Sequence, residues 1–486
     1  MSSESAADSA PSPEQNRGAT IGLWLGPALA VLVYLLPASD ALSVPAHRLA
    51  CVTVLMATWW MTEALPVAVT ALLPLALFPL LGISTAKVVA PNYGNDLIWL
   101  FFGGFQLAFA VERWQLHRRL AMFMVRTFGT RSDRLILGFM LASGLLSMWL
   151  LNTSTTLMLL PVAMAVAATI GKETFGKALM LGLAYAASVG GMGTYLGTAP
   201  NGVFRDVAGK NGIELSFGAW MGFAAPLSIL LIGFIWVYVT RIAFKVDKVP
   251  LGADHPAHAA LSSGRSPWTA GEKRVAIIFL TAVGLWISRK YILEALSLDP
   301  KLVTDATVAI VVTIMLYLFR APTENGSTPL MSWNETAKTP WHILILFGGG
   351  FALAAAFKST GLSVWMGSIL ADLTAGWPLP LMVLAVVLFM TFLTEVTSNT
   401  ATSIILLPVI CDLAMAADVE PLMLMLPATL AASCAFMLPV ATPPNAVVYG
   451  SGLIRMPDMA RVGFGLNLGT SILITVWTLT WGRMVL

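Results

Sequence analysis

The strongest constraint on this chain is a succession of apolar segments long enough to cross a lipid bilayer. A membrane-spanning helix needs about 20 consecutive apolar residues. Hydrophobic residues make up 57% of the 486 residues and charged residues only 11%, whereas soluble domains carry about 25% charge. These features predict an all-α polytopic membrane protein. Candidate spans lie near residues 19–37, 96–112, 178–198, 217–240, 275–288, 303–319, 341–357, 421–440 and 463–482.

Three other apolar regions do not fit a single span. The run 49–83 is too long for one helix, and we expect Pro66 to divide it, because proline removes a backbone donor and clashes with the preceding turn. The regions 134–170 and 379–417 each contain a polar break, "LNTSTT" from residue 151 and "SNTATS" from residue 398. We interpret these two regions as re-entrant hairpins, which leaves about eleven transmembrane helices.

The distribution of basic residues predicts the orientation of the chain. Lys and Arg concentrate on the cytoplasmic side of membrane proteins, and residues 113–134 contain six arginines. The next basic segment, 171–177, contains two lysines. Both segments are cytoplasmic if the chain between them enters the membrane, turns at Asn152-Thr153 and returns. Continuing this count places residues 241–274 and the N-terminus in the cytoplasm and opens the second hairpin to the outside.

Three short blocks of sequence occur twice, in the same order and at nearly the same spacing. Because the two hairpins enter from opposite sides, the halves are predicted to be inverted repeats, and inverted repeats with broken helices are the plan of many secondary transporters. The offsets are 246, 247 and 244 residues. The blocks are "FFGGFQLA" at 101–108 and "FGGGFALA" at 347–354, "NTSTTLMLLPV" at 152–162 and "NTATSIILLPV" at 399–409, and "GTAPN" at 197–201 and "ATPPN" at 441–445.

The repeat predicts the domain organisation. Each half is expected to contain one hairpin followed by one helix that a proline-containing loop interrupts. The predicted segments are a disordered tail at 1–17, a first transmembrane helix at 18–44, repeat 1 at 45–241 with its hairpin at about 134–170 and broken helix at about 178–209, a cytoplasmic linker at 242–274, and repeat 2 at 275–486 with its hairpin at about 379–417 and broken helix at about 421–453.

The polar breaks suit the binding of an anion together with cations. Helix N-termini offer free N–H groups and positive partial charge to carboxylates, and helix C-terminal carbonyl oxygens suit Na+. Neither break nor interrupting loop contains Lys or Arg, so co-bound cations would have to offset the charge of a dianion. Glu63 and Glu395 are the nearest acidic residues. Each is either a proton-coupling group or a carboxyl hydrogen-bonded within packed protein.

Other classes of function fit the sequence less well. The five histidines are scattered without metal-binding spacing, and the three cysteines, all in apolar segments, are expected to be packing residues. We therefore expect neither an enzyme nor an organic cofactor. A channel would need a continuous pore, whereas inverted repeats around a midplane site favour alternating access. The net charge of +3 is too small to indicate a nucleic-acid partner.

These motifs together resemble the divalent anion/sodium symporters, the INDY-type dicarboxylate and citrate carriers. The resemblance rests on the paired Asn-Thr motifs, on "WWMTEALPVAVTALLPL" at 59–75 and on the two Pro-Asn loops, and it covers residues 45–485. It implies a homodimer whose transport domains move like elevators against a scaffold. It also implies Na+-coupled uptake of succinate, malate or fumarate and, for a bacterial protein, a place in the inner membrane.

The resemblance also implies the site residues. The first Na+ site would use Ser147, Asn152 and Gly197, and the second would use Thr394, Ser398, Asn399 and Ala441. Substrate would contact Asn152, Thr153, Thr198 and Pro200 from one half and Asn399, Thr400, Thr442 and Pro443 from the other.

Leu151 departs from the family pattern, which has Ser at that position. If the family contact is made through the backbone carbonyl, the first Na+ site persists with altered affinity. If the hydroxyl is the ligand, the site is weakened, and a Na+-independent dicarboxylate exchanger or a proton-linked carrier becomes the alternative to symport.

Overall fold

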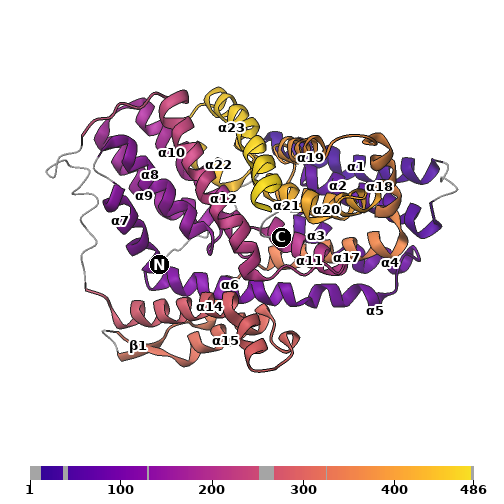
Figure 1. Ribbon diagram of the computed structural model, residues 1–486, viewed down its shortest axis with the longest axis horizontal. Helices are drawn as coiled ribbons and strands as arrows, with labels where there is room; N and C mark the ends of the chain where they lie inside the picture. Colours follow the sequence, from indigo (N-terminus) through magenta and orange to yellow (C-terminus); the bar gives the residue numbers. More distant parts are fainter. Residues whose placement is uncertain (1–12, 37–41, 129–130, 251–266, 324–325, 483–486) are drawn as a thin grey trace.

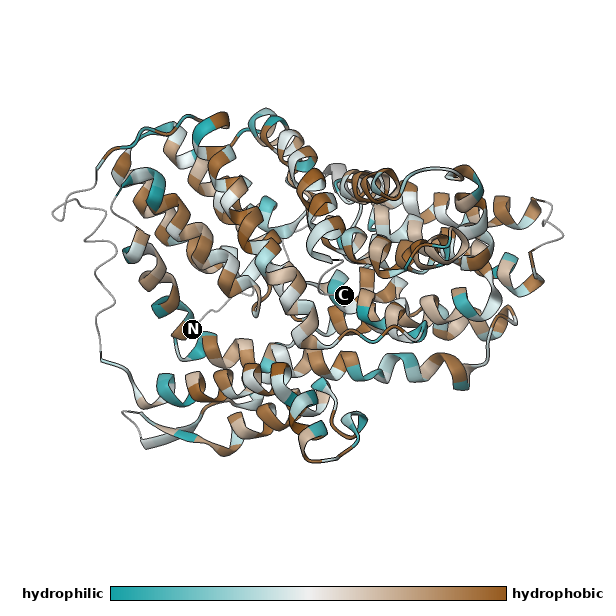
Figure 2. Cartoon of the chain, in the orientation of Figure 1, coloured by the Kyte–Doolittle hydropathy of each residue, from teal (hydrophilic) through white to brown (hydrophobic). Residues whose placement is uncertain are grey.

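In the computed structural model the chain is described over residues 13–36, 42–128, 131–250, 267–323 and 326–482. Within these residues, nine helices are long and apolar enough to cross a membrane, in agreement with the predicted polytopic fold. Hydrophobic residues cover most of the helices along their length (Figure 2), and many large apolar side chains are exposed. Such a surface is expected where lipid covers the protein.

The N-terminal part of the chain departs in one place from the expected boundaries. The first helix begins at Pro13, so residues 13–17 are helical, whereas residues 1–12 of the expected tail lie outside the described residues. The apolar run 49–83 is divided at Pro66 as expected. The elements are α1 (Pro13–Leu35), α2 (Val44–Thr62), α3 (Val67–Thr70), α4 (Leu73–Leu80), α5 (Ala86–Val89), the 3-10 turn η1 (Ala90–Gly94), α6 (Asp96–Arg113) and α7 (Leu116–Phe128).

The first hairpin and the first broken helix follow. The predicted linker at 242–274 ends earlier than expected, because α14 begins at Ala270, and residues 251–266 lie outside the described residues. The elements are α8 (Ser132–Ser147), α9 (Asn152–Ile170), α10 (Glu173–Gly190), the 3-10 turn η2 (Gly191–Gly193), α11 (Ala199–Lys210), α12 (Phe217–Val237) and the π-helical turn η3 (Tyr238–Ala243).

The C-terminal half adds a short antiparallel β-hairpin that the sequence analysis did not predict, in which Arg320 pairs with Pro329 and Thr323 with Gly326. The elements are α14 (Ala270–Ala295), η4 (Pro300–Leu302), α15 (Asp305–Leu318), β1 (Arg320–Thr323), β2 (Gly326–Pro329), α16 (Trp333–Thr336), α17 (Trp341–Thr360), α18 (Leu362–Leu373), α19 (Leu379–Leu393), α20 (Asn399–Ala416), α21 (Leu422–Ala431), α22 (Pro443–Tyr449), α23 (Met456–Trp477) and the π-helical turn η5 (Thr478–Gly482).

The same succession of elements occurs in both halves. Helices α6 to α12 and the π-helical turn η3 correspond in order to α17 to α23 and the π-helical turn η5. In Figure 1, the hairpin helices α8 and α9 lie on one side of α12 and α23, and α19 and α20 lie on the other. The opposite orientation of the two halves in the membrane stays a prediction.

The first hairpin turns slightly earlier than expected. Helix α8 ends at Ser147 and α9 begins at Asn152, so residues 148–151 form the turn, and Asn152-Thr153 starts the returning helix. The 16 residues of α8 span about 24 Å at 1.5 Å per residue, which is less than the roughly 30 Å of a bilayer core. This length supports a segment that turns back within the membrane.

The broken helices exchange partners between the two halves. Helix α11, which follows the first interrupting loop, packs against α20 of the second hairpin, and α22 packs against α9 of the first hairpin and against α10. The Tyr185 hydroxyl on α10 donates a hydrogen bond of 2.7 Å to the carbonyl oxygen of Phe436 in the second loop. This exchange places each hairpin beside the broken helix of the other repeat.

A second group of helices packs around α6. Helices α14 and α15 lie along α6 (Figure 1), with α15 packed closely against it, and the β-hairpin packs against α14 and α15. At one end of α6, Arg113 pairs with Glu335 at 3.1 Å, and the Trp114 indole donates to the carbonyl oxygen of Leu330 at 2.9 Å.

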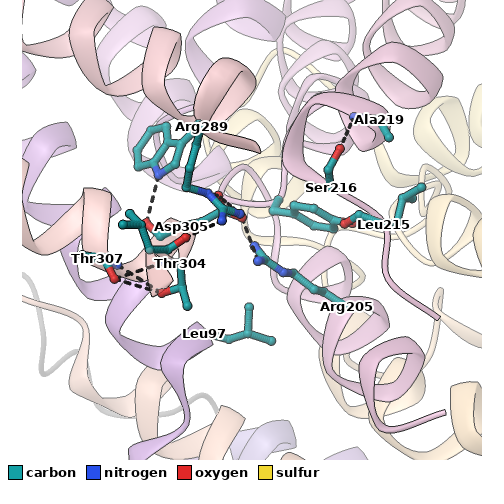
Figure 3. A network of polar contacts seen from close by, with 12 residues as sticks. Leu97, Arg205, Leu215, Ser216, Ala219, Arg289, Thr304, Asp305 and Thr307 are labelled. Atoms are coloured by element: carbon teal, nitrogen blue, oxygen red, sulfur yellow. Dashed lines mark hydrogen bonds and ion pairs between the residues drawn. The ribbon is translucent and has the colours of Figure 1, made fainter. Parts of the chain in front are cut away.

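A buried ion cluster joins α11 to α14 and α15. Asp305 is fully buried and pairs with Arg205 at 2.7 Å and with Arg289 at 2.9 Å. Figure 3 shows the two guanidinium groups approaching Asp305 from different helices. Arg289 also donates to the carbonyl oxygens of Pro300 and Val303. Arg289 is therefore held within the pair of α14 and α15, whereas Arg205 reaches Asp305 from α11.

Candidate ion and substrate site

The first polar break collects oxygen atoms at the turn of the first hairpin. Ser147 Oγ lies 2.5 Å from the Asn152 side-chain amide. The same end of that amide lies 3.2 Å from the carbonyl oxygen of Gly197 and 3.3 Å from that of Ala187. Ser147, Asn152 and Gly197 are the three residues that the resemblance implies for the first Na+ site, and the structure brings them together. The Ala187 carbonyl was not predicted.

The Asn152 amide can serve this cluster in two ways. With its NH2 group facing inward it donates to the surrounding oxygens, and with Oδ1 facing inward it adds a fourth oxygen that a cation can bind. Exchange between these two orientations would allow the same residues to be satisfied with and without a bound ion.

Two glycines make the close approach of these segments possible. A Cβ atom on Gly197 would lie 2.4 Å from the carbonyl oxygen of Gly191 and 2.7 Å from that of Ser147. A Cβ atom on Gly191 would lie 2.7 Å from the Asn152 side chain. Because backbone atoms cannot yield at the distances found at Gly197, that position requires glycine for the loop to reach the hairpin turn. At Gly191 the nearest backbone atom is the Gly197 carbonyl oxygen, at 3.0 Å from such a Cβ atom.

The second polar break repeats part of this arrangement. Thr394 caps the C-terminus of α19, and its hydroxyl contacts the Asn399 side chain and donates to the carbonyl oxygen of Ala432 at 3.1 Å. Ala432 occupies the position in "AAS" that Ala187 occupies in the first half. Ser398 is the N-cap of α20, and Ala441 donates its N–H to Leu438 O at 3.2 Å. Their part in an ion site stays a prediction.

Both hairpins present a helix N-terminus that no side chain caps. Leu151 precedes α9 and Ser398 precedes α20, and neither side chain makes a capping hydrogen bond. The first backbone N–H groups of these helices therefore remain available to an anion. Thr153 and Thr400 are partly exposed in the first turns, where their hydroxyl groups can contact the same ligand.

The other predicted substrate residues lie where the chain resumes a helix after each interrupting loop. Thr198 is the N-cap of α11, and Pro200 is the second residue of that helix. Thr442 is the N-cap of α22, with its hydroxyl accepting from the Asn445 N–H at 3.3 Å, and Pro443 is the first residue of that helix. Their role in substrate binding stays a prediction.

Glu395 is engaged in structural hydrogen bonds. Its carboxylate is buried and accepts from the backbone N–H groups of Phe436, Met437 and Leu438 at 2.7–3.2 Å and from Asn467 Nδ2 at 2.7 Å. The carboxylate thus holds the unwound backbone of the second loop, which favours the reading of a carboxyl satisfied within packed protein. Glu63 is exposed at the C-cap of α2.

The loop before α11, in the first half, is held by a hydroxyl group instead of a carboxylate. The position equivalent to Glu395 is Met148, whose carbonyl oxygen accepts from the Thr194 hydroxyl at 2.5 Å. The Thr194 hydroxyl in turn accepts from the N–H groups of Leu196 and Gly197 at 3.2 Å. A carboxylate therefore supports only the second of the two equivalent loops.

Two further candidate residues were not predicted from the sequence. Asn201 and Asn445 end the motifs "GTAPN" and "ATPPN", and each donates its side-chain amide to at least two carbonyl oxygens of the preceding loop. Their recurrence at the same place in both motifs was a signal that could have identified them.

The chemistry of both breaks suits an alkali cation. Their ligands are hydroxyl, amide and backbone carbonyl oxygens, which are the groups that bind Na+ in transporters with broken helices. In the described part of the chain, no group of three or more His, Cys, Asp or Glu side chains is arranged to hold a metal ion.

Broken helices, paired hairpins and oxygen-rich breaks define a membrane transporter of the secondary type. The chain matches the family described as "Sodium:sulfate symporter transmembrane region" over residues 20–486. It belongs to this family, which confirms the resemblance to the divalent anion/sodium symporters and identifies the protein as a transporter.

Several relatives are similar over nearly their full length. The sodium-dependent dicarboxylate transporter SdcS of Staphylococcus saprophyticus is 40% identical over 478 residues, which cover 95% of this chain and 91% of the relative. The protein of the same name from Staphylococcus aureus strain USA300 is 40% identical over 471 residues, covering 94% and 90%. The structure of the Alcanivorax borkumensis YdaH transporter shares the fold, with a TM-score of 0.55 and 15% identity, over 90% of this chain and 99% of that one.

Proposed function

We propose that this protein carries C4-dicarboxylates such as succinate, malate and fumarate into the cell by Na+-coupled symport. The observation that carries the proposal is the pair of equivalent clusters, Ser147–Asn152 with the Ala187 carbonyl and Thr394–Asn399 with the Ala432 carbonyl. Each cluster supplies neutral oxygen ligands for one cation beside an uncapped helix N-terminus for a carboxylate. The names of the SdcS relatives support the same substrate class and ion.

The charge balance of the site favours coupling to cations. Neither break nor interrupting loop contains Lys or Arg, and two helix N-termini together supply roughly one positive charge. A dicarboxylate dianion within the membrane therefore needs additional positive charge, which two bound Na+ ions would supply. Transport of the dianion then depends on the Na+ gradient because empty cation sites leave the substrate charge uncompensated.

The packing supports an elevator-type movement between two groups of helices. The hairpins and the broken helices exchange partners and would move together as the transport domain, while α6, α14 and α15 would belong to the scaffold. The Arg205–Asp305 pair connects the two groups. We further propose a homodimer in the bacterial inner membrane with a cytoplasmic N-terminus, as the resemblance and the basic segments 113–134 and 171–177 imply.

Flux measurements with the purified protein in proteoliposomes test this function. Radiolabelled succinate should accumulate when an inward Na+ gradient is imposed and should not accumulate when K+ or choline replaces Na+. Uptake that is equal without Na+ and is stimulated by a dicarboxylate inside the vesicles would overturn symport in favour of exchange.

Leu151 is the one observation that favours the exchanger. It lies at the N-cap of α9 with its side chain packed against apolar neighbours, where the second hairpin has Ser398. Its carbonyl oxygen accepts from the Thr155 N–H at 3.0 Å, and a carbonyl oxygen has a second lone pair that can bind a cation. The first cluster thus keeps backbone ligands but lacks one hydroxyl group.

A further inference from the structure

The loops that interrupt the two broken helices are each held by one asparagine. Asn201 is the third residue of α11. Its Nδ2 group donates to the carbonyl oxygen of Gly191 at 3.0 Å and to that of Thr194 at 2.7 Å, with a longer contact of 3.5 Å to that of Met192. The side chain therefore bridges two peptide groups of the loop that precedes its own helix.

The second half contains the same arrangement. Asn445 is the third residue of α22, and its Nδ2 group donates to the carbonyl oxygens of Ala435 and Leu438, both at 3.0 Å. The donor and both acceptors are each displaced by 244 positions from Asn201, Gly191 and Thr194. One chain therefore builds the same three-point contact twice.

The orientation of the Asn201 and Asn445 side chains indicates that their NH2 groups, and not their oxygens, hold the loops. Asn201 and Asn445 are fully buried, and among the described residues neither Oδ1 atom has a hydrogen-bond partner. Turning either amide round would set its oxygen against two carbonyl oxygens. An unpaired buried oxygen is costly, so the contribution of these residues lies in the two donated hydrogen bonds.

The clamped peptide groups are close to the ion clusters. In the first half, Gly191 lies against Asn152 and against the Gly197 carbonyl group. In the second half, Leu438 is held at both ends of its backbone, because Glu395 accepts from its N–H at 3.2 Å and Asn445 donates to its carbonyl oxygen. Fixing these peptide groups fixes the loop carbonyls that the ion sites would use.

We propose that Asn201 and Asn445 are positioning residues for the two cation sites, each holding an unwound loop so that its carbonyl oxygens keep the spacing that Na+ requires. The proposal rests on the Na+-coupled function proposed above. A cage whose oxygens are fixed in place discriminates between cations of different radius, whereas a loosened cage does not. Loss of either clamp should therefore weaken Na+ binding and reduce the preference for Na+ over Li+.

The test uses Asn201→Asp and Asn445→Asp in the full-length protein. Aspartate keeps the shape of the side chain but replaces the donor by an acceptor. Asn211→Asp is the matched control, because Asn211 donates to the carbonyl oxygen of Val207 at 3.0 Å at the opposite end of α11. Asn201→Ala and Asn445→Ala remove the donor without adding charge and replace any aspartate variant that does not fold.

Two readouts separate positioning from general damage. The first is the Na+ concentration that gives half-maximal thermal stabilisation of the detergent-purified protein without substrate, measured for Na+ and for Li+. The second is the Na+ dependence of succinate uptake in proteoliposomes. We expect the Na+ midpoint to rise by about tenfold in each loop variant, which corresponds to the loss of roughly one hydrogen bond, with Li+ affected less and with near-normal maximal uptake at saturating Na+.

The outcomes distinguish this inference from the proposed function. If wild type and loop variants share the same Na+ midpoint, and the variants lose only maximal uptake, the positioning role is wrong while Na+ coupling stands. If Na+ stabilises the wild type but succinate is not carried, the substrate proposal fails, and the thermal measurement still decides the positioning role. A wild-type protein without any response to Na+ would overturn both.

Discussion

Phe101 and Phe347 occupy equivalent positions in the two repeated motifs, and their rings pack against each other with centroids 4.6 Å apart. A residue can touch its own counterpart only where both lie near the axis that relates the two halves. If such an axis relates the two halves, as the predicted inverted repeat requires, the phenylalanine pair lies beside it, on α6 and α17. Two sites that are related by such an axis can act on one ligand between them.

Loss of either hairpin asparagine should abolish most transport. We expect Asn152→Ala and Asn399→Ala each to reduce succinate uptake by about five- to 150-fold, because each removes a contact worth roughly 1–3 kcal/mol to a charged ligand. Uptake into proteoliposomes, normalised to the amount of folded protein, is the measurement. Wild-type flux in either variant would show that the two hairpins do not share one site.

Restoring a hydroxyl group at position 151 should improve the use of Na+. In the Leu151→Ser variant the side chain gains an oxygen beside the first cluster, and a contact of that kind is worth about 1–3 kcal/mol when it serves a charge. We expect the Na+ concentration for half-maximal uptake to fall by about five- to 150-fold. A Na+ titration of both proteins, with choline as the replacement cation, measures this change. Identical titrations would indicate that position 151 contributes only its backbone.

Replacing Glu395 by glutamine should damage the second loop specifically. Glutamine offers one acceptor oxygen in place of two and carries no charge, so at least one hydrogen bond to Phe436, Met437 or Leu438 is lost, at a cost of roughly 1.5–3 kcal/mol. We expect a lower melting temperature and a higher Na+ midpoint. Met148→Leu, at the equivalent position of the first half, is a volume-conserving control that should change neither by much.

The ion cluster around Asp305 should respond unequally to loss of its members. Asp305→Asn leaves two guanidinium groups without a counter-charge, which typically costs 3–5 kcal/mol when the site is buried. Arg205→Gln should cost less, because Asp305 keeps Arg289. We expect the melting temperature to fall less in Arg205→Gln than in Asp305→Asn. The reverse order in a thermal-unfolding series would show that Arg289 alone does not satisfy Asp305 once Arg205 is lost.

Labelling of single cysteines should establish the orientation of the repeats. A cysteine at Lys172, between α9 and α10, should react with a membrane-impermeant maleimide only from the cytoplasmic side. A cysteine at Ala375, before the second hairpin, should react only from outside. The native Cys51, Cys411 and Cys434 are buried and provide the background control. Reaction of both sites from the same side would exclude inverted repeats.

Side-chain motifs predicted much of the candidate site. The repeated Asn-Thr motifs located both hairpins, and the approach of Ser147, Asn152 and Gly197 followed from the family pattern. The Ala187 and Ala432 carbonyls could not be predicted, since a backbone oxygen leaves no mark in the residue types. The turn was misplaced by a few residues because Asn and Thr favour both turns and helix starts.

Contacts between residues far apart in the sequence account for most of the features that could not be predicted. Arg205 and Asp305 are 100 positions apart and lie on helices that only the folded chain brings together. The exchange of α11 and α22 between the halves is of the same kind, because a repeat reveals which segments correspond but not which of them pack together. Asn201 and Asn445 could have been predicted from the sequence, since each is the last residue of a motif already recognised as repeated.

The exchanged packing of α22 and α9 has a consequence for synthesis of the chain. Helix α9 ends at Ile170 and α22 begins at Pro443, so the ribosome adds 272 intervening residues before the partner of α9 exists. At about 5–20 residues per second, the first hairpin waits roughly 14–54 seconds in the membrane with one face uncovered. A premature stop before α22 would therefore leave α9 without this partner, even where most of the second half has already been made.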